Sequence, residues 1–201
     1  MSDDPGRYLA AGPRVGLRAY ALDDAAEFTA HVRAGRALHR PWLFPPDSPE
    51  AYATYARAIL ADSAREGFLV CERAEGGRLA GFVNINNIVR GAFLSGTLGY
   101  GAFAHAAGRG VMSEALGLLL PYAFGPLGLH RLEANIQPGN APSRALVRRA
   151  GFRLEGFSPA MLFIDGDWRD HERWAITAPR TGPADRPAPP AGSSGPAAHR
   201  L

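Results

Sequence analysis

The chain has 201 residues, of which 46% are hydrophobic and 20% charged, a composition typical of one globular domain with a sizeable core. No apolar run is long enough to cross a bilayer and the first residues do not resemble a secretory signal, so we expect a cytoplasmic protein with no membrane partner. All 22 basic residues are arginine and the net charge is +3, but no block of like charge suggests direct nucleic-acid binding. The single cysteine, Cys71, excludes an intramolecular disulfide and a cysteine-based zinc cluster, and we expect a buried, unreactive thiol.

The spacing of apolar residues predicts short strands separated by helices. In chain order we expect a strand at 15–18, helices at 22–33 and 49–64, strands at 67–73, 78–88 and 97–103, a helix from 111 that Pro121 kinks or ends, a strand at 130–137, a helix at 140–150, and strands at 152–157, 160–164 and 168–177. Residues 14–178 would form one domain. Residues 1–13 are expected to be a flexible leader, and residues 179–201, of which fourteen are Pro, Ala or Gly, a disordered tail.

Two turns, Gly76-Gly77 and Asp165-Gly166, predict hairpins, so most neighbouring strands should be antiparallel. The strand–helix–strand unit over residues 97–137 predicts one parallel pair. We therefore expect an α/β or α+β fold, a mixed and mostly antiparallel sheet of about seven strands flanked by about four helices.

The segment around Gly108 and Gly110 joins an expected strand to an amphipathic helix that begins at Val111. The first backbone N–H groups of a helix have no partner within it, and they lie at the positive end of the helix dipole. Because glycine has no Cβ, an anion can approach this backbone closely, so the turn suits a phosphate or pyrophosphate. The spacing matches neither a Walker loop nor GxGxxG, and a plain tight turn explains the glycines equally well.

Four stretches of the chain, in this order, resemble the GNAT acetyltransferases, above all the RimJ/RimL group and its RimJ type. They are residues 81–91, the turn at 105–110, residues 129–143 and residues 164–171. The resemblance covers about residues 14–178, and it implies the GNAT fold, acetyl-CoA as co-substrate and no metal. His105 departs from the family pattern, which has Gln or Arg at that position of the coenzyme loop.

The resemblance also implies how the coenzyme is held. In the family, the strand before the glycine turn bulges, and its free amides hold the pantetheine and polarise the thioester carbonyl. The turn amides hold the pyrophosphate. By this correspondence the coenzyme-binding residues are Leu98, Gly99, Tyr100, His105, Ala107, Gly108, Arg109, Gly110, Val111, Met112, Asn135, Asn140 and Ser143.

Direct attack of an amine on a thioester needs a neutral amine and a proton for the leaving thiolate. By resemblance, Ser143 lies near the coenzyme sulfur and supplies that proton; otherwise it is a polar helix residue beside the cap Asn140. Relatives often carry a carboxylate near the positions of Ala160 and Met161, which are apolar here. Glu133 is our candidate for the general base unless its side chain points outward. Water would serve for an N-terminal amine, whose pKa is about 7.7–8.0.

Asparagine is uncommon in strands, so Asn84 and Asn86 are candidates for binding the acceptor, with Trp42 as a wall of the acceptor groove. A capped strand end and aromatic core packing are the respective alternatives. Asp170 and His171 are adjacent on an expected strand and should face opposite ways. For them we favour a hydrogen-bonded structural role over an acid–base pair.

The RimJ type acetylates the N-terminal alanine of a small-subunit ribosomal protein. The resemblance therefore implies an acetyl-CoA-dependent N-acetyltransferase, a monomer or homodimer, that acts on an N-terminal Ala or Ser of a ribosomal or other protein. Two alternatives stay open. One is an enzyme that acetylates a small amine such as an antibiotic or a polyamine. The other is a ribosome-associated factor that binds coenzyme A without catalysis, and the missing carboxylate is its only support in the sequence.

Overall fold

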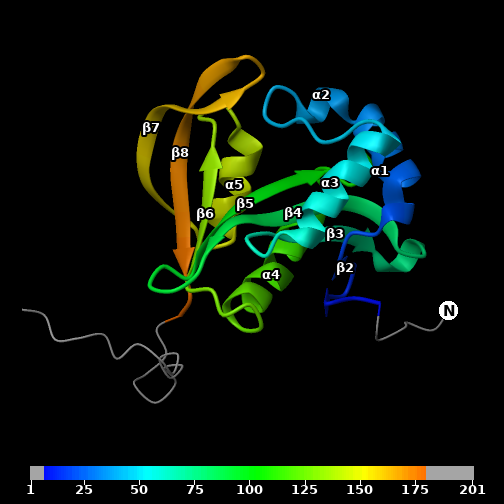
Figure 1. The fold of residues 1–201 in the computed structure, drawn as a ribbon, viewed down its shortest axis with the longest axis horizontal. Coiled ribbons are helices and arrows are strands. Elements are labelled where there is room, and N and C mark those ends of the chain that lie inside the picture. Colours follow the sequence, from blue (N-terminus) through cyan, green and yellow to red (C-terminus); the bar gives the residue numbers. More distant parts are fainter. Residues whose placement is uncertain (1–6, 180–201) are drawn as a thin grey trace, which may run out of the picture.

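A computed structural model of the protein describes residues 7–179; residues 1–6 and 180–201, which include most of the expected tail, lie outside the described part. Its strands are β1 (Ala10–Ala11), β2 (Val15–Arg18), β3 (Glu66–Glu72), β4 (Arg78–Val89), β5 (Ser95–Ala102), β6 (Arg131–Ile136), β7 (Arg153–Ile164) and β8 (Asp167–Thr177). Its helices are η1 (Leu22–Asp24), α1 (Ala25–Ala34), α2 (Arg36–His39), α3 (Pro49–Ala61), η2 (Arg73–Glu75), α4 (Val111–Phe124) and α5 (Ala141–Arg149). The strands form one sheet in the order β1-β2-β3-β4-β5-β6-β8-β7 (Figure 1).

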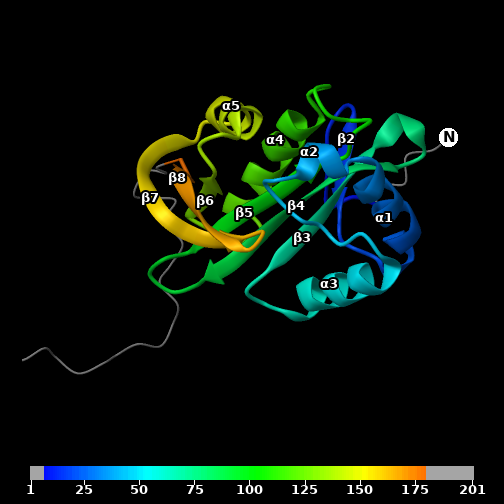
Figure 2. The same cartoon turned by 90° about the horizontal axis from the view of Figure 1, so that it is seen from above.

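Helices cover both faces of this sheet: α1 and α3 lie over one face, and α4 and α5 over the other (Figure 2). Phe82 and Val83, adjacent on β4, belong to different cores, because successive side chains of a strand point to opposite faces. Phe82 packs with Phe28 of α1, and Val83 belongs to the core that contains Leu119 of α4. The predicted mixed, mostly antiparallel sheet with helices on its faces is therefore confirmed, with eight strands instead of about seven.

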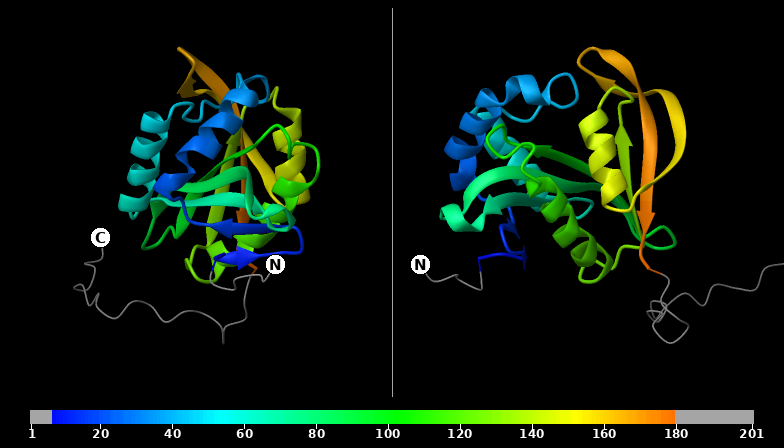
Figure 3. Two further views of the ribbon diagram at one scale, coloured as in Figure 1. Left: turned by 90° about the vertical axis from the view of Figure 1, so that its right-hand side faces the viewer. Right: turned by 180° about the vertical axis from the view of Figure 1, so that it is seen from behind.

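The predicted parallel pair is β5 with β6, which α4 connects. The two strands pair only over Ser95–Thr97 and Arg131–Glu133. β5 continues to Ala102 and β6 to Ile136, so both strands run on beyond their last shared pair. The sheet thus consists of two parts, β1 to β5 and β6 to β8, which diverge on one side of a short seam (Figure 3).

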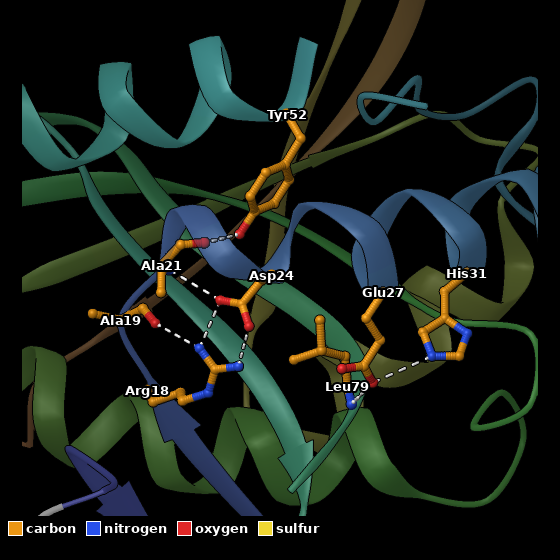
Figure 4. A network of polar contacts seen from close by, with 8 residues as sticks. All are labelled: Arg18, Ala19, Ala21, Asp24, Glu27, His31, Tyr52 and Leu79. Carbon is orange, nitrogen blue, oxygen red and sulfur yellow. Dashed lines mark hydrogen bonds and ion pairs between the residues drawn. The ribbon is translucent and has the colours of Figure 1, made fainter. Parts of the chain in front are cut away.

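Two aspartates precede the first helix, and either Asp23 or Asp24 would be expected to cap it. The Asp24 carboxylate does not cap α1; it accepts a hydrogen bond from the backbone N–H of Ala21 at 3.0 Å and pairs with Arg18 at 2.6 Å (Figure 4). Tyr52 of α3 donates to the carbonyl of Ala21 at 2.9 Å. The segment between β2 and α1 is thereby fastened to its own strand and to α3. Helix α3 begins as predicted, with the Ser48 hydroxyl accepting from Ala51 N–H at 3.2 Å.

Several predicted elements differ from the structure. Ala10–Ala11, inside the expected leader, form a strand that pairs with β2. Helix α4 passes through Pro121 to Phe124, so of the two predicted outcomes, a kink or an end, the helix does not end there; a proline in the last turn removes little of the helix ladder. The strands expected at 152–157 and 160–164 are one strand, β7, whose register with β8 shifts twice. A bulge interrupts pairing without ending a strand.

Cys71 is buried in β3, as predicted, and burial raises the pKa of its thiol. Within residues 7–179, no helix has both the length and the apolar character needed to span a membrane.

Candidate active site

A cavity of about 880 Å³ opens where β5 and β6 diverge. Its walls are the edge of β5 from Leu98 to Ala102, the end of β6 with the start of α5, and the segment that includes α2 and Trp42. The turn before α4 closes one end. Trp42 reaches across the opening: a Cβ added to Gly139, in the loop after β6, would lie 3.0 Å from the indole. The cavity therefore has contributions from both parts of the sheet.

Most of the residues predicted for the site line this cavity. They are Trp42, Leu98, Gly99, Tyr100, Ala107, Gly108, Gly110, Val111, Met112, Asn135, Asn140 and Ser143.

The glycine turn has the backbone geometry that an anion site requires. Gly108 and Gly110 have φ of +74° and +79°, in the left-handed region that favours glycine. Gly110 is the N-cap of α4, and no side chain caps this helix. A Cβ on Gly108 would meet no atom within 4 Å, so the turn leaves open space in front of its backbone. The first N–H groups of α4 are therefore available to a phosphate group.

The side chains of His105 and Arg109 do not line the cavity. Both lie against Glu72 of β3: His105 Nε2 is 3.7 Å and Arg109 Nη1 is 3.1 Å from its carboxylate oxygens. The His105 ring also contacts His31, and burial, with nearby Arg78 and His31, lowers the pKa of the imidazole. Any contact of His105 and Arg109 with the coenzyme is therefore left to their backbone groups, as the resemblance implies for this loop. The two side chains tie the turn to β3.

Strand β5 does not bulge at Leu98–Tyr100, contrary to the resemblance. Its register with β4 is regular from Thr97 to Ala102, and the irregularity lies on β4, where Asn87 has φ of 52°. The open edge of β5 arises because β6 turns away after Glu133. Main-chain groups of β5 thus become available through the divergence of two strands.

Ser143 and Tyr100 form a hydrogen-bonded pair across the cavity, with 2.6 Å between Oγ and Oη. Asn140 caps α5, its Oδ1 accepting from the N–H of Ser143 at 3.2 Å, so the cap also positions Ser143. Burial raises the pKa of Tyr100 to about 12, so both groups are neutral hydroxyls near pH 7. The capping and coenzyme-binding interpretations of Asn140 are compatible in this geometry.

Asn84 has a structural role instead of the predicted contact with the acceptor. Its Nδ2 donates to Tyr55 Oη at 2.6 Å, and its Oδ1 accepts from Tyr20 Oη at 3.1 Å. The side chain is buried and joins α3 to the segment after β2. Asn86 lies by Gly99, where an added Cβ would be 3.3 Å from Asn86 Nδ2, but it is not a wall residue of the cavity.

Glu133 is also outside the cavity wall. Its carboxylate pairs with Arg131 at 2.8 Å, and Arg131 binds Glu155 of β7 as well. The strand period of two places Glu133 on the same face of β6 as Asn135. Its ion pair with Arg131 leaves the carboxylate outside the cavity wall, which removes our candidate for the general base.

The cavity has five polar wall residues that sequence reasoning did not assign to the site: His39, Ser113, Gln137, Arg149 and His171. His39 Nε2 donates to the carbonyl of Ala102 at 2.8 Å, and burial lowers the pKa of this imidazole. Gln137 follows Asn135 at the strand period of two, a signal that could have identified it. Histidines from α2 and β8 reach the cavity only through the fold.

Three buried polar atoms of the wall have no hydrogen-bond partner among the described residues: His39 Nδ1, Asn135 Oδ1 and Gln137 Nε2. An unpaired buried polar atom costs about 1–3 kcal/mol, so such atoms indicate a polar ligand. A pantetheine chain has amide groups of this kind, and the start of α4 suits its pyrophosphate. The wall residues therefore fit coenzyme A.

The family model of the acetyltransferase (GNAT) domain matches residues 14–153, well over half of the chain. The chain therefore belongs to the GNAT acetyltransferases, whose domain uses acetyl-CoA as co-substrate.

Individual relatives show which members of this family the chain is similar to. The [ribosomal protein uS5]-alanine N-acetyltransferase of Escherichia coli (strain K12) is 41% identical over 101 residues, which are 50% of this chain and 52% of that protein. The chain spans about half the length of the curated relatives it matches most strongly. The solved structure of Mycobacterium smegmatis RimJ in complex with CoA-disulfide superposes with a TM-score of 0.76 at 31% identity, covering 82% of each chain. A Vibrio fischeri ribosomal-protein-S5-alanine acetyltransferase, at 24% identity and a TM-score of 0.75 over 83% of this chain and 94% of that one, shares the fold.

Proposed function

We propose that the protein transfers the acetyl group of acetyl-CoA to the N-terminal amine of a protein that begins with Ala or Ser, and that a cytoplasmic ribosomal protein is its acceptor. The observation that carries the proposal is the single cavity that contains both the uncapped start of α4 and the hydroxyl pair of Tyr100 and Ser143. The name of the E. coli relative supports the acceptor class.

Acetyl-CoA supplies an activated acetyl group as a thioester. The first amides of α4 would bind the pyrophosphate, and the diverging edge of β5 would face the pantetheine. The Tyr100–Ser143 pair holds a proton for the leaving sulfur. A hydroxyl is a weak acid in water, but a positioned donor in a buried site is more effective. Each of these roles belongs to a group on the cavity wall.

An N-terminal amine suits this wall better than a lysine side chain. Its pKa is about 7.7–8.0 against about 10.4 for lysine, so a larger fraction of it is already neutral near pH 7. Less base strength is then required, in keeping with a wall without a carboxylate among its described residues.

The test uses purified protein, acetyl-CoA and short peptides, with thiol release and peptide mass as readouts. Peptides that begin with Ala or Ser should be acetylated, and the same peptides with a blocked N-terminus should not. Acetylation of spermidine alone would select the small-amine alternative. Coenzyme binding without turnover on any amine would select the non-catalytic alternative.

A further inference from the structure

His171 of β8 lies on the cavity wall and is 2% exposed. Its neighbour Asp170 faces away, and the Asp170 carboxylate accepts a hydrogen bond from the backbone N–H of Ala160 in the irregular part of β7 at 2.8 Å. The two side chains therefore form no acid–base pair, as strand alternation predicts. Asp170 fastens β7 to β8, which leaves His171 without an assigned role.

One ring nitrogen of His171 has a fixed role. Nδ1 is 2.9 Å from the backbone carbonyl oxygen of Arg169. A carbonyl oxygen only accepts hydrogen bonds, so Nδ1 carries the proton in this contact. The neutral ring then has its lone pair on Nε2, to which no residue in the described part of the chain donates a hydrogen bond. His171 is thus held in one tautomer with a free basic nitrogen.

Strand pairing places this nitrogen near other polar side chains that have an atom without a hydrogen-bond partner among residues 7–179. Asn135 pairs with Arg173 and Ile136 with Glu172, so His171 stands level with Gln137 at the end of β6. Residues two apart on a strand share a face, which puts His171 on the same face as Asn135. Asn135 Oδ1 is a buried acceptor without a partner. An ammonium group needs such acceptors, because it has only N–H donors.

The other candidates for a base are less suitable. Glu133 pairs with Arg131 and lies outside the wall. His39 lies on the wall, but its Nε2 is bound to the carbonyl of Ala102, and burial lowers the pKa of the ring.

We propose that His171 is the general base for acetyl transfer, a role that rests on the proposed function only in requiring an amine acceptor. Nε2 takes one proton from the acceptor ammonium. The freed lone pair forms the N–C bond, and the C–S bond of the thioester breaks. The Tyr100–Ser143 pair gives a proton to the sulfur and regains one from the new amide nitrogen. His171 then returns its proton to water.

The first experiment replaces the base. In His171→Gln, turnover on the best acceptor should fall about 10²-fold or more, the usual contribution of a general base. The dissociation constant for acetyl-CoA, measured by calorimetry, should stay within about twofold, since the variant keeps a polar side chain of similar reach. Glu133→Gln is the matched control and should keep its turnover within about twofold, because its side chain lies outside the cavity.

A second variant separates chemistry from folding. His171→Gly leaves space for free imidazole, which should raise its turnover at least about tenfold while acetyl-CoA binding is retained. A purely structural histidine would show no such rescue. In the coenzyme-free protein, nitrogen NMR of the His171 ring should show the Nδ1–H tautomer.

Three results would overturn the proposal: turnover of His171→Gln within about threefold of the wild type, no rescue by imidazole, or an Nε2–H tautomer. Loss of coenzyme binding in both variants would mean a structural role and would overturn it too. Wild-type protein that acetylates spermidine but no peptide would refute the proposed acceptor, and the His171 experiments would then be run on spermidine. Absence of turnover on every amine would refute both proposals.

Discussion

Tyr100 on β5 and Ser143 on α5 hydrogen-bond to each other at 2.6 Å, although β5 and β6 have already diverged at that level. This hydrogen bond crosses the cavity, and so does the close approach of the Trp42 indole to Gly139. It joins two neutral hydroxyls, since burial keeps the pKa of Tyr100 at about 12. The two hydroxyls therefore form one proton-donating unit.

If the pair acts as a unit, its two halves should not contribute independently. Ser143→Ala and Tyr100→Phe should each lower kcat about 10- to 100-fold while the affinity for acetyl-CoA changes little. The double variant should be no worse than the poorer single variant, because groups that act together are not additive. Steady-state kinetics with calorimetry would check this. Multiplicative losses would mean that the hydroxyls act separately.

Gly108→Ala should weaken coenzyme binding by more than its effect on folding explains. Its φ is +74°, and that of Gly76, in the β3–β4 turn, is +70°; neither has an atom within 4 Å of an added Cβ. Both alanine variants should lose about 1–2 kcal/mol of stability from the left-handed backbone. Only Gly108→Ala should raise the dissociation constant for acetyl-CoA. Equal coenzyme affinity in the two variants would remove the turn from the coenzyme site.

Trp42→Ala should raise KM for the peptide acceptor several-fold, because the indole forms a wall of the cavity and contacts Gly139. The control is Phe93→Ala, which removes an aromatic ring that is 70% exposed, between β4 and β5. Phe93→Ala should leave KM unchanged. Peptide titrations at saturating acetyl-CoA measure both, and an unchanged KM in Trp42→Ala would place the acceptor elsewhere.

Asn84→Ala should affect stability without affecting the acceptor. The variant leaves the hydroxyls of Tyr20 and Tyr55 without their shared buried partner, at a cost of about 1–3 kcal/mol. Urea unfolding would measure the loss, and peptide kinetics on the remaining folded protein should give the wild-type KM. A raised KM with unchanged stability would restore the substrate-binding role that we first predicted.

Protonation of His39 should make the folded protein less stable in mild acid. Burial lowers its pKa in the folded protein, while in the unfolded chain the pKa is about 6.5. Below pH 6.5 the unfolded chain binds more protons, so stability is complete above that pH and falls as the pH drops toward the lower folded value. Melting temperatures between pH 7 and pH 5 should show a smaller decrease in His39→Gln than in the wild type. Parallel curves would mean that His39 keeps its ordinary pKa.

Much of the fold could be predicted because its signals are local. The turns at Gly76 and Asp165-Gly166, the cap at Ser48 and the glycine turn before α4 each depend on residues within a few positions. The coenzyme turn was predictable for the same reason, since residues 107–112 are continuous in the chain. The strand prediction failed at the short β1, inside the expected leader, and at β7, which was predicted as two strands.

The rest depends on partners that are distant in the sequence. The role of Asn84 is set by Tyr20 and Tyr55, 64 and 29 positions away. The side chains of His105 and Arg109 lie outside the cavity because Glu72, on another strand, binds both of them. No local pattern predicts that the pairing of β5 with β6 ends after three residue pairs. The cavity that His171 lines opens where these two strands diverge.

The short seam between β5 and β6 has a mechanical consequence. The pairs from Ser95 to Thr97 are the strand pairing that joins β5 to β6, so beyond Thr97 no ladder connects the two strands. A ligand that fills the opening contacts both parts of the sheet, at the level where β5 and β6 no longer pair. Amide hydrogen exchange should then slow on β5 and β6 together when acetyl-CoA binds. The coenzyme would then hold the two parts of the sheet together as well as supply the acetyl group.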